Sequence, residues 1–342
     1  MEANFLEKLI GNEDLSVGEA RDLMSAIMAG GLKEAQTAAI LTALRMKGET
    51  VDEIAAFAAV MREHAVRIFP KRRGLVDTCG TGGDARRTFN ISTATALVAA
   101  AMGIPVAKHG NRAVSSRCGS ADVLEALGVN IRLCPESVAE LIDRVGIGFM
   151  FAPQHHPAMK HAAPVRKKMG VRTVFNVLGP LTNPAGVRLQ LIGVFRKELT
   201  EVLCRVLGVM GSERAFVVHG LDGVDEVSIS AETQISALQG GAIRTFRFAP
   251  EDVGIRRAAI SEIEGGSPDE NAAHIRRILG GAEGPRTDAV LLNAAFVGVL
   301  AGRASSVDEG VCIAREAIES GKAVDLLDRL RKTSHSLAKE AA

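Results

Sequence analysis

The sequence predicts an α/β protein with a small all-helical domain and a larger α/β domain built on a mostly parallel central sheet. Three observations carry this prediction. Helical periodicity runs through residues 1–70, short apolar runs alternate with helical stretches from residue 75 onward, and glycine-rich polar loops follow two of those runs. Such alternation is typical of parallel sheets, whose ligands gather beyond the carboxyl ends of the strands.

The amino-terminal region carries start and stop signals for several helices. The segments Ser16–Glu19 and Thr50–Glu53 have the capping-box spacing, in which a hydroxyl and a carboxylate satisfy N–H groups at a helix start. Gly30 and Gly48 provide stops. Apolar residues between these signals recur at helical spacing, which predicts packed amphipathic helices. Proline, glycine and a basic cluster at residues 70–74 end the pattern and predict a domain boundary at a solvated hinge.

From Leu75 onward, short apolar runs bounded by glycine, proline or polar residues predict strands. These runs lie at 75–76, 106–107, 149–151, 191–194 and 215–218. Helical patterns cover 121–127, 135–145, 199–210 and the tail from Ala289, which we expect to cover one face of the sheet. Residues 154–189 depart from the alternation, because four prolines make this stretch a turn-rich excursion with one short basic helix.

Two polar loops follow strand candidates. In the first, residues 80–84 (GTGGD), side chains are nearly absent, so successive backbone N–H groups can turn toward one anion. This loop has neither the P-loop nor the dinucleotide-binding spacing. Residues 90–93 (NIST) then open a helix, whose dipole also favours negative charge. The second loop, residues 108–116 (KHGNRAVSS), adds two cations and several donors. Together the loops predict a ligand with more than one phosphate.

Asp225 and Glu226 form the clearest candidate for a hard-cation site. Adjacent residues on a strand point to opposite faces, so both acids can serve one site only on a turn. A solvated acidic loop is the alternative. Because phosphate-type loops require countercharge, we favour magnesium between these carboxylates and phosphate oxygens. His155, His156 and His161 lack the spacing, and the cysteine or carboxylate partners, of a zinc site.

Composition and charge argue against several classes of function. The chain has 41 basic and 40 acidic residues and a net charge of +1, which does not indicate a nucleic-acid or membrane-surface partner. Five scattered cysteines without Cys-x-x-Cys pairing fit a reducing cytosol, so we expect a cytoplasmic protein. The amino terminus lacks a signal-peptide pattern. The longest apolar run, residues 289–301, is too short to span a bilayer.

The motifs occur in an order that resembles a known family. They are GTGGD with TFNIST, KHGNRAVSS with GSADVLEALGV, the segment at residues 151–185, and VHGLDGVDEVS. They span nearly the whole chain and resemble the anthranilate phosphoribosyltransferases of tryptophan biosynthesis. The resemblance implies transfer of phosphoribose from phosphoribosyl pyrophosphate to the amine of anthranilate, a magnesium cofactor (Mg2+) and a homodimer.

The resemblance also implies a fold of the nucleoside phosphorylase and phosphoribosyltransferase type. In this arrangement the helical domain, residues 1–70, is completed by part of residues 155–189. Residues 71–154 and 190–342 form the α/β domain that binds phosphoribosyl pyrophosphate. The excursion then lines the site of the aromatic substrate.

Roles of individual residues follow from the same resemblance. Magnesium contacts are implied for Ser92, Asp225 and Glu226, and anthranilate contacts for Gly80, Asn111 and Arg166. Contacts to phosphoribosyl pyrophosphate are implied for Gly80, Gly83, Asp84, Thr88, Asn90, Ile91, Ser92, Thr93, Lys108, His109, Gly110, Asn111, Arg112, Ala113, Val114, Ser115, Ser116 and Ser120. A planar guanidinium suits a carboxylate, although a solvated helix face also explains Arg166. We assign no catalytic residue and expect His109 to position the amine, because an aromatic amine is already nucleophilic near neutral pH.

One departure and two alternatives remain open. Ala85-Arg86-Arg87 follows GTGGD where the family often has a small residue, and its arginines are either solvated or in contact with phosphate. A pyrimidine nucleoside phosphorylase shares the fold and the glycine loop, but the Lys108–Arg112 motif and the acids at 225–226 favour the transferase. A catalytically silent nucleic-acid binder is the other alternative, and the net charge of +1 and the intact acids count against it.

Overall fold

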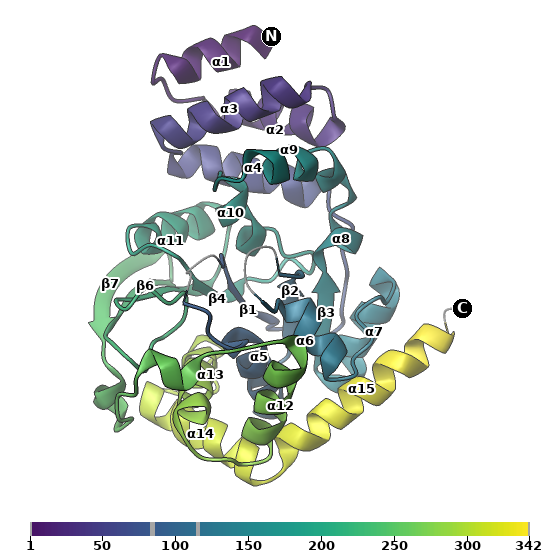
Figure 1. Ribbon diagram of the computed structural model, residues 1–342, viewed down its shortest axis with the longest axis vertical. Helices are drawn as coiled ribbons and strands as arrows, with labels where there is room; N and C mark the ends of the chain where they lie inside the picture. The colour runs from purple at the N-terminus through teal and green to yellow at the C-terminus, as the bar shows by residue number, and fades with distance from the viewer. Residues whose placement is uncertain (1, 83–85, 114–116, 341–342) are drawn as a thin grey trace.

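The computed structural model describes residues 2–82, 86–113 and 117–340, and Figure 1 shows a layer of helices at one end of a larger α/β body. The amino-terminal helices are α1 (Glu2–Ile10), α2 (Val17–Ala29), α3 (Glu34–Lys47) and α4 (Val51–Glu63). Both predicted capping boxes are confirmed. The carboxylates of Glu19 and Glu53 accept hydrogen bonds from Ser16 N and Thr50 N, each at 2.8 Å.

One sheet forms the centre of the larger part. Its strands are β1 (Val76–Gly80), β2 (Val106–Gly110), β3 (Ile147–Phe151), β4 (Leu189–Gly193), β5 (Arg214–Gly220), β6 (Thr233–Gln239) and β7 (Ala242–Phe248), in the spatial order β3-β2-β1-β4-β5-β6-β7. The first five in this order are parallel, and β6 and β7 add an antiparallel hairpin. The predicted class, with a mostly parallel sheet, is therefore confirmed. The five parallel strands were predicted from the sequence, whereas the β6–β7 hairpin was not.

Helices cover both faces of this sheet. On one face α5 (Ile91–Ala101) packs against α13 (Pro285–Leu300), and on the other α11 (Leu199–Val209) packs against the sheet and α4. Alternation along β4 shows the division: Leu191 belongs to the apolar core around α13, and Ile192 to the core around α11. Figure 1 shows the other helices around this framework: α6 (Ser120–Ala126), α7 (Pro135–Val145), α12 (Pro268–Leu279), α14 (Val307–Glu319) and α15 (Lys322–Glu340).

The chain between β3 and β4 crosses back to the amino-terminal helices. It contains α8 (Ala152–His155), η1 (Pro157–Lys160), α9 (Ala163–Met169), α10 (Phe175–Leu178) and η2 (Gly179–Leu181). Phe175 is buried in the same apolar core as α2, α3 and α4. Arg62 Nε donates to the Leu181 carbonyl oxygen at 2.7 Å. Because this core continues to α11 and one face of the sheet, the helical layer and the sheet share apolar packing. The domain limits given above stay a prediction.

Among the described residues, no helix combines the length and the apolar character that a membrane crossing requires.

Candidate active site

The site lies at the carboxyl edge of the parallel strands, where β1 and β4 end in paired glycines. Gly80 and Gly193 are neighbours in register. A Cβ atom on Gly80 would lie 2.4 Å from Asp225 Oδ2, and a Cβ atom on Gly193 would lie 1.5 Å from the Asp225 carbonyl oxygen. Only glycine at both strand ends lets the acidic loop come this close.

Asp225 and Glu226 reach two different parts of the predicted phosphate site. Gly82 N donates to Asp225 Oδ2 at 2.8 Å, and Ser92 N donates to Glu226 Oε1 at 3.1 Å. Both acids follow β5 on a turn, as their shared role requires. The structure thus brings together the three residues implied as metal contacts. Carboxylate and hydroxyl oxygens are hard ligands, so the donor set fits magnesium.

Lys108 is buried next to this cluster. Its Nζ atom donates to the Thr78 carbonyl oxygen and to Ser92 Oγ, the latter at 3.4 Å. Burial lowers the pKa of Lys108, while the nearby charges of Asp77 and Glu226 oppose that shift. The ammonium group is therefore held in a fixed position near the start of α5, where it can meet a phosphate as a point charge.

Asp77, a fully buried carboxylate on β1, ties β2 to the excursion. It accepts hydrogen bonds from His109 N at 3.2 Å and from Asn183 Nδ2 at 2.7 Å, and Asn183 Nδ2 also donates to the Ala107 carbonyl oxygen at 2.8 Å. Burial raises the pKa of Asp77, and the charge of Lys108 acts against that rise. Neither Asp77 nor Asn183 was predicted from the sequence as a site residue. Asp77 directly follows a strand candidate in the sequence, and an acid buried in a strand requires hydrogen-bond partners. Its position was therefore the signal that could have identified it.

The side chain of Asn90, at the start of α5, is held from two sides. Asn90 Nδ2 donates to the Cys118 carbonyl oxygen at 3.2 Å, and Asn90 Oδ1 accepts from Asn271 Nδ2 at 2.9 Å. Asn271 lies on α12, is 2% exposed, and was missed by the sequence analysis. Just before Asn90, Thr88 forms an antiparallel bridge with Glu264. The segment leading into α5 is therefore clamped by the chain around α12.

Two residues implied as substrate contacts have buried side chains. Ile91 is 2% exposed and Thr93 is 1% exposed. Their N–H groups donate to the carbonyl oxygens of Phe89 and Asn90. The structure therefore turns both side chains into the core, and their proposed contacts with substrate stay a prediction.

Asp122 of α6 folds the second loop back on itself. Its carboxylate accepts from Ala113 N at 3.0 Å. Arg112 Nη1 lies 2.8 Å from Asp122 Oδ1 and 2.6 Å from Glu125 Oε2. Because Arg112 is paired with two carboxylates, its charge is largely compensated. Lys108 is the better placed cation for phosphate.

Gly110, Asn111 and Ser120 lie together at the end of β2. Ser120 Oγ donates to the Asn111 carbonyl oxygen at 3.2 Å, and a Cβ atom on Gly110 would lie 2.2 Å from Ser120 Oγ. Glycine is therefore required where α6 meets this strand. Five further residues implied as contacts lie outside the described residues: Gly83, Asp84, Val114, Ser115 and Ser116.

His109 and His156 form a buried histidine pair, with ring centroids 5.0 Å apart. Burial, followed by the charge of a second histidine, lowers the pKa of His156 to about 4 and that of His109 well below its usual value. Within the described residues, neither Nε2 atom has a hydrogen-bond partner. On the same excursion as His156, the half-buried guanidinium of Arg166 lies 5.1 Å from the centre of the Phe175 ring.

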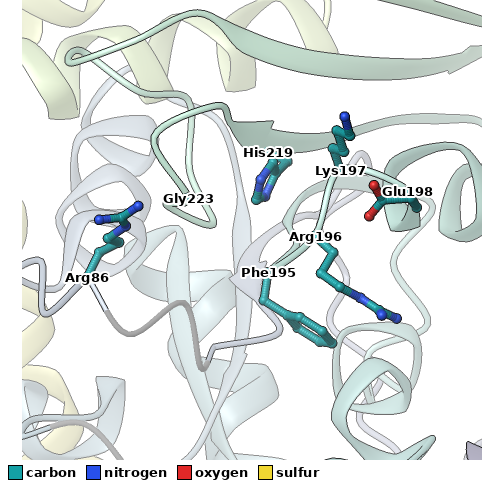
Figure 2. Close-up of a pocket in the computed structure, with 7 residues that line it drawn as sticks. All are labelled: Arg86, Phe195, Arg196, Lys197, Glu198, His219 and Gly223. Carbon is teal, nitrogen blue, oxygen red and sulfur yellow. The ribbon is translucent and has the colours of Figure 1, made fainter.

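A pocket of about 540 Å³ lies beside the acidic loop. Its lining includes Arg86, Phe195, Arg196, Lys197, His219 and Gly223. Figure 2 shows the His219 ring between the Gly223 turn and the segment that carries Lys197. Arg86 was noted in the sequence as an extra cation beside the glycine loop, and the other lining residues had no predicted role.

Both parts of the chain match a glycosyl transferase family. Residues 3–65 match its helical bundle domain, and residues 72–324 match its a/b domain. The fold and the phosphate-type loops at the sheet edge agree with this match, and they define the class of the protein as a glycosyl transferase.

The chain is 52% identical to the anthranilate phosphoribosyltransferases of Moorella thermoacetica, over 95% of this chain and 96% of that one, and Symbiobacterium thermophilum, over 98% and 99%. It belongs to the anthranilate phosphoribosyltransferase family. Solved structures agree. The enzyme from Thermus thermophilus has a TM-score of 0.91 at 46% identity, covering 97% of this chain and 99% of that one. The enzyme from Saccharomyces cerevisiae, in complex with PRPP and Mg, has a TM-score of 0.90 at 29% identity, covering 98% of both.

Proposed function

We propose that this protein transfers the 5-phosphoribosyl group from phosphoribosyl pyrophosphate to the amine of anthranilate, releasing pyrophosphate, as a step of tryptophan biosynthesis. One observation carries the proposal: Asp225 and Glu226 hold the glycine loop and the start of α5 through Gly82 N and Ser92 N. Carboxylates and phosphate-type main-chain sites therefore meet at one place. The family favours this activity over a nucleoside phosphorylase or a silent nucleic-acid binder.

Phosphoribosyl pyrophosphate binds along the two polar loops in this proposal. Lys108 supplies a buried point charge, and Asn90 supplies an amide whose orientation is fixed by Asn271. Main-chain N–H groups of the glycine loop and the positive end of the α5 dipole favour the phosphates. The described part of the second loop, with Asn111, supports the same ligand.

Ser92, Asp225 and Glu226 would hold the magnesium ion. Their oxygen donors suit a hard cation that also binds phosphate oxygens, and the yeast relative was solved in complex with PRPP and Mg. Bound magnesium supplies charge neutralisation for the departing pyrophosphate. The chain's own part is to fix the carboxylates, which Gly82 N and Ser92 N do.

The reaction requires positioning more than proton transfer. As the amine nitrogen of anthranilate forms its bond to the sugar carbon, the bond from that carbon to the pyrophosphate oxygen breaks, and the surplus amine proton passes to solvent. Arg166 would hold the anthranilate carboxylate through its planar fork. Burial makes His109 and His156 weak bases, so they would orient the amine rather than deprotonate it. Most of the rate enhancement then comes from alignment and from stabilising the leaving anion.

A homodimer is part of the proposal. Three large apolar side chains on the helical layer are more than half exposed: Ile10 at 71%, Val17 at 52% and Met46 at 83%. A second copy packed on this layer would remove these side chains from water. Light scattering should give twice the mass of 36.0 kDa, and Ile10→Lys/Met46→Lys should lower that mass. A monomeric wild-type protein would contradict this part.

A cytoplasmic location is proposed on the state of the cysteines. The five cysteines all lie in the described residues and no disulfide joins them, as expected in a reducing compartment. Rapid alkylation of freshly lysed cells, followed by mass spectrometry, should find the thiols reduced and the protein in the cytosolic fraction. Recovery of oxidised protein outside that fraction would contradict the location.

The deciding experiment follows the fluorescence of anthranilate after phosphoribosyl pyrophosphate is added, with and without magnesium. The chain contains neither Trp nor Tyr, so its own emission interferes little. We expect a magnesium-dependent loss of signal with one pyrophosphate released per anthranilate consumed. No loss with folded protein and fresh substrates would contradict the proposed function.

A further inference from the structure

We propose that the pocket beside the acidic loop is a second anion site, which binds inorganic pyrophosphate after it leaves the reaction centre. The pocket lies between the segment 195–198 and the turn at Gly223 (Figure 2). The same turn carries Asp225 and Glu226, so the pocket and the proposed magnesium site share a wall. The inference rests on the proposed function, which supplies pyrophosphate as the product.

Arg86 is seated in the pocket against a glycine. Gly223 has a φ of +97°, and a Cβ atom there would lie 2.9 Å from Arg86 Nε and 3.0 Å from Arg86 Nη2. The guanidinium therefore lies on the bare main chain of Gly223, where any other residue would displace it. A planar guanidinium suits a phosphate group, which it can bind through two N–H groups. The sequence left Arg86 either solvated or in contact with substrate phosphate, and the proposal gives it a third role, contact with the released pyrophosphate.

The opposite wall is held in place by the glycine loop and the sheet. Phe195 N donates to Thr81 Oγ1 at 3.2 Å, which joins this wall to the loop of the reaction site. The Lys197 carbonyl oxygen accepts from the Gln234 side chain at 3.0 Å. His219 Nδ1 lies 2.7 Å from the Val194 carbonyl oxygen. Because a carbonyl oxygen only accepts, Nδ1 carries a proton and donates it to this oxygen, which fixes the orientation of the His219 ring in the wall.

The charge of the lining selects an anion. Among the described residues of the lining, Arg86, Arg196 and Lys197 are basic and Glu198 is acidic. Arg196 lies 5.5 Å from the centre of the Phe195 ring, Arg86 lies against the Gly223 turn, and Lys197 lies on the segment that forms the opposite wall. The positive end of the α11 dipole adds to their field. Pyrophosphate carries negative charge on two linked phosphates, so we expect a basic lining to hold it more tightly than inorganic phosphate, which has one such group.

The test measures pyrophosphate binding when the substrate site is already filled. Pyrophosphate is titrated calorimetrically into the protein with magnesium and saturating phosphoribosyl pyrophosphate, in the absence of anthranilate. We expect the wild type to retain one pyrophosphate site per chain. In Arg86→Gln/Lys197→Gln we expect the Kd of that site to rise about tenfold or more. Lys322→Gln/Arg331→Gln makes the same change in net charge on exposed positions of α15 and should bind like the wild type.

Three results would overturn the inference. They are loss of all pyrophosphate binding once phosphoribosyl pyrophosphate is saturating, equal affinity of the pocket variant and the wild type, and equal affinity of the pocket for inorganic phosphate. A separate titration with phosphoribosyl pyrophosphate tests the proposed function itself. If that substrate fails to bind, the proposed function fails, while the comparison of the two variants still decides whether the pocket takes pyrophosphate.

Inhibition kinetics give a second, independent readout. Pyrophosphate bound in a separate pocket should inhibit even when phosphoribosyl pyrophosphate is saturating, and the pocket variant should lose this component. We expect the KM for phosphoribosyl pyrophosphate to change by no more than about twofold in that variant. An increase in this KM equal to the increase in the inhibition constant would place Arg86 on the substrate phosphates and overturn the separate site.

Discussion

The side chain of Asn271 donates a hydrogen bond to the side chain of Asn90, with Nδ2 and Oδ1 2.9 Å apart. Asn271 Oδ1 in turn accepts from Gly266 N at 2.8 Å, so both ends of this amide are engaged. Asn90 Nδ2 donates to the Cys118 carbonyl oxygen at 3.2 Å. A residue on α12 thus fixes the orientation of the amide at the start of α5, where the proposed phosphate site begins.

Replacing Asn271 by Asp should weaken binding of phosphoribosyl pyrophosphate. The carboxylate can still accept from Gly266 N, but it cannot donate to Asn90 Oδ1. One lost hydrogen bond corresponds to about 0.5–1.5 kcal/mol, so we expect the KM for phosphoribosyl pyrophosphate to rise roughly 2- to 10-fold. The KM for anthranilate should stay nearly constant. Asp269→Asn on the same helix is the control, and equal changes in both KM values would show that Asn271 is only structural.

Replacing both acids by amides, as Asp225→Asn/Glu226→Gln, should remove the magnesium dependence of turnover. Amides keep the shape of the side chains and the hydrogen bonds from Gly82 N and Ser92 N, but they lack the charge that a hard cation requires. Rates measured across a magnesium titration should become low and flat. Circular dichroism checks that the variant is folded, and an unchanged magnesium dependence would contradict the metal assignment.

Arg166→Ala should raise the KM for anthranilate much more than the KM for phosphoribosyl pyrophosphate. A charge-assisted bond to a carboxylate corresponds to about 1.5–3 kcal/mol, so the expected increase is roughly 10- to 100-fold. Arg166→Lys keeps the charge without the planar fork and should recover only part of the loss. Equal effects on the two substrates would make Arg166 a structural residue that packs on Phe175.

The parallel part of the fold was predictable because each strand ends in glycine, proline or polar residues and alternates with a helical pattern. The hairpin β6–β7 was missed, although Gly240 and Gly241 join two alternating segments and both have positive φ values, 57° and 80°. A two-residue Gly-Gly loop between such segments is a hairpin signal in its own right. The β6–β7 hairpin could therefore have been predicted from the sequence.

The residues that support the site could not be predicted from the sequence, for a different reason. Asp77, Asn183 and Asn271 act through partners that are distant in sequence: 106 residues separate Asn183 from Asp77, and 181 separate Asn271 from Asn90. Local pattern carries no information on such pairs, because they exist only once the sheet and α12 are in place. The acid pair was predictable since both members lie in one short motif that itself requires a turn.

Gly193→Ala should displace the acidic loop that carries Asp225 and so disrupt the site. The added Cβ atom would lie 1.5 Å from the Asp225 carbonyl oxygen, so the acidic loop must move away from the end of β4. Overpacking of this kind costs about 1–3 kcal/mol, and we expect a lower Tm together with loss of activity. Gly208→Ala on α11, where the nearest atom would lie 3.6 Å away, is the matched control and should leave both nearly unchanged. A fully active Gly193→Ala variant would contradict the close contact.

The buried histidine pair should make the protein less stable in mild acid. Burial and the charge of His155 lower the pKa of His156 to about 4 in the folded state, whereas an unfolded histidine has a pKa of about 6.5. Between these values the unfolded chain binds more protons, so stability rises with pH in this range and falls as the pH drops from 7 toward 4. For His156 the loss between pH 7 and pH 5 should be on the order of 2 kcal/mol.

His156→Asn removes this titration, so the Tm of the variant should fall less than that of the wild type between pH 7 and pH 5. His335→Gln, on the exposed side of α15, controls for the loss of an imidazole. Other groups contribute to the slope in both proteins, so the difference between the two slopes is the quantity that reports His156. Parallel Tm curves for the wild type and His156→Asn would show that this histidine keeps an ordinary pKa despite its burial, and the weak-base argument for the pair would then fail with it.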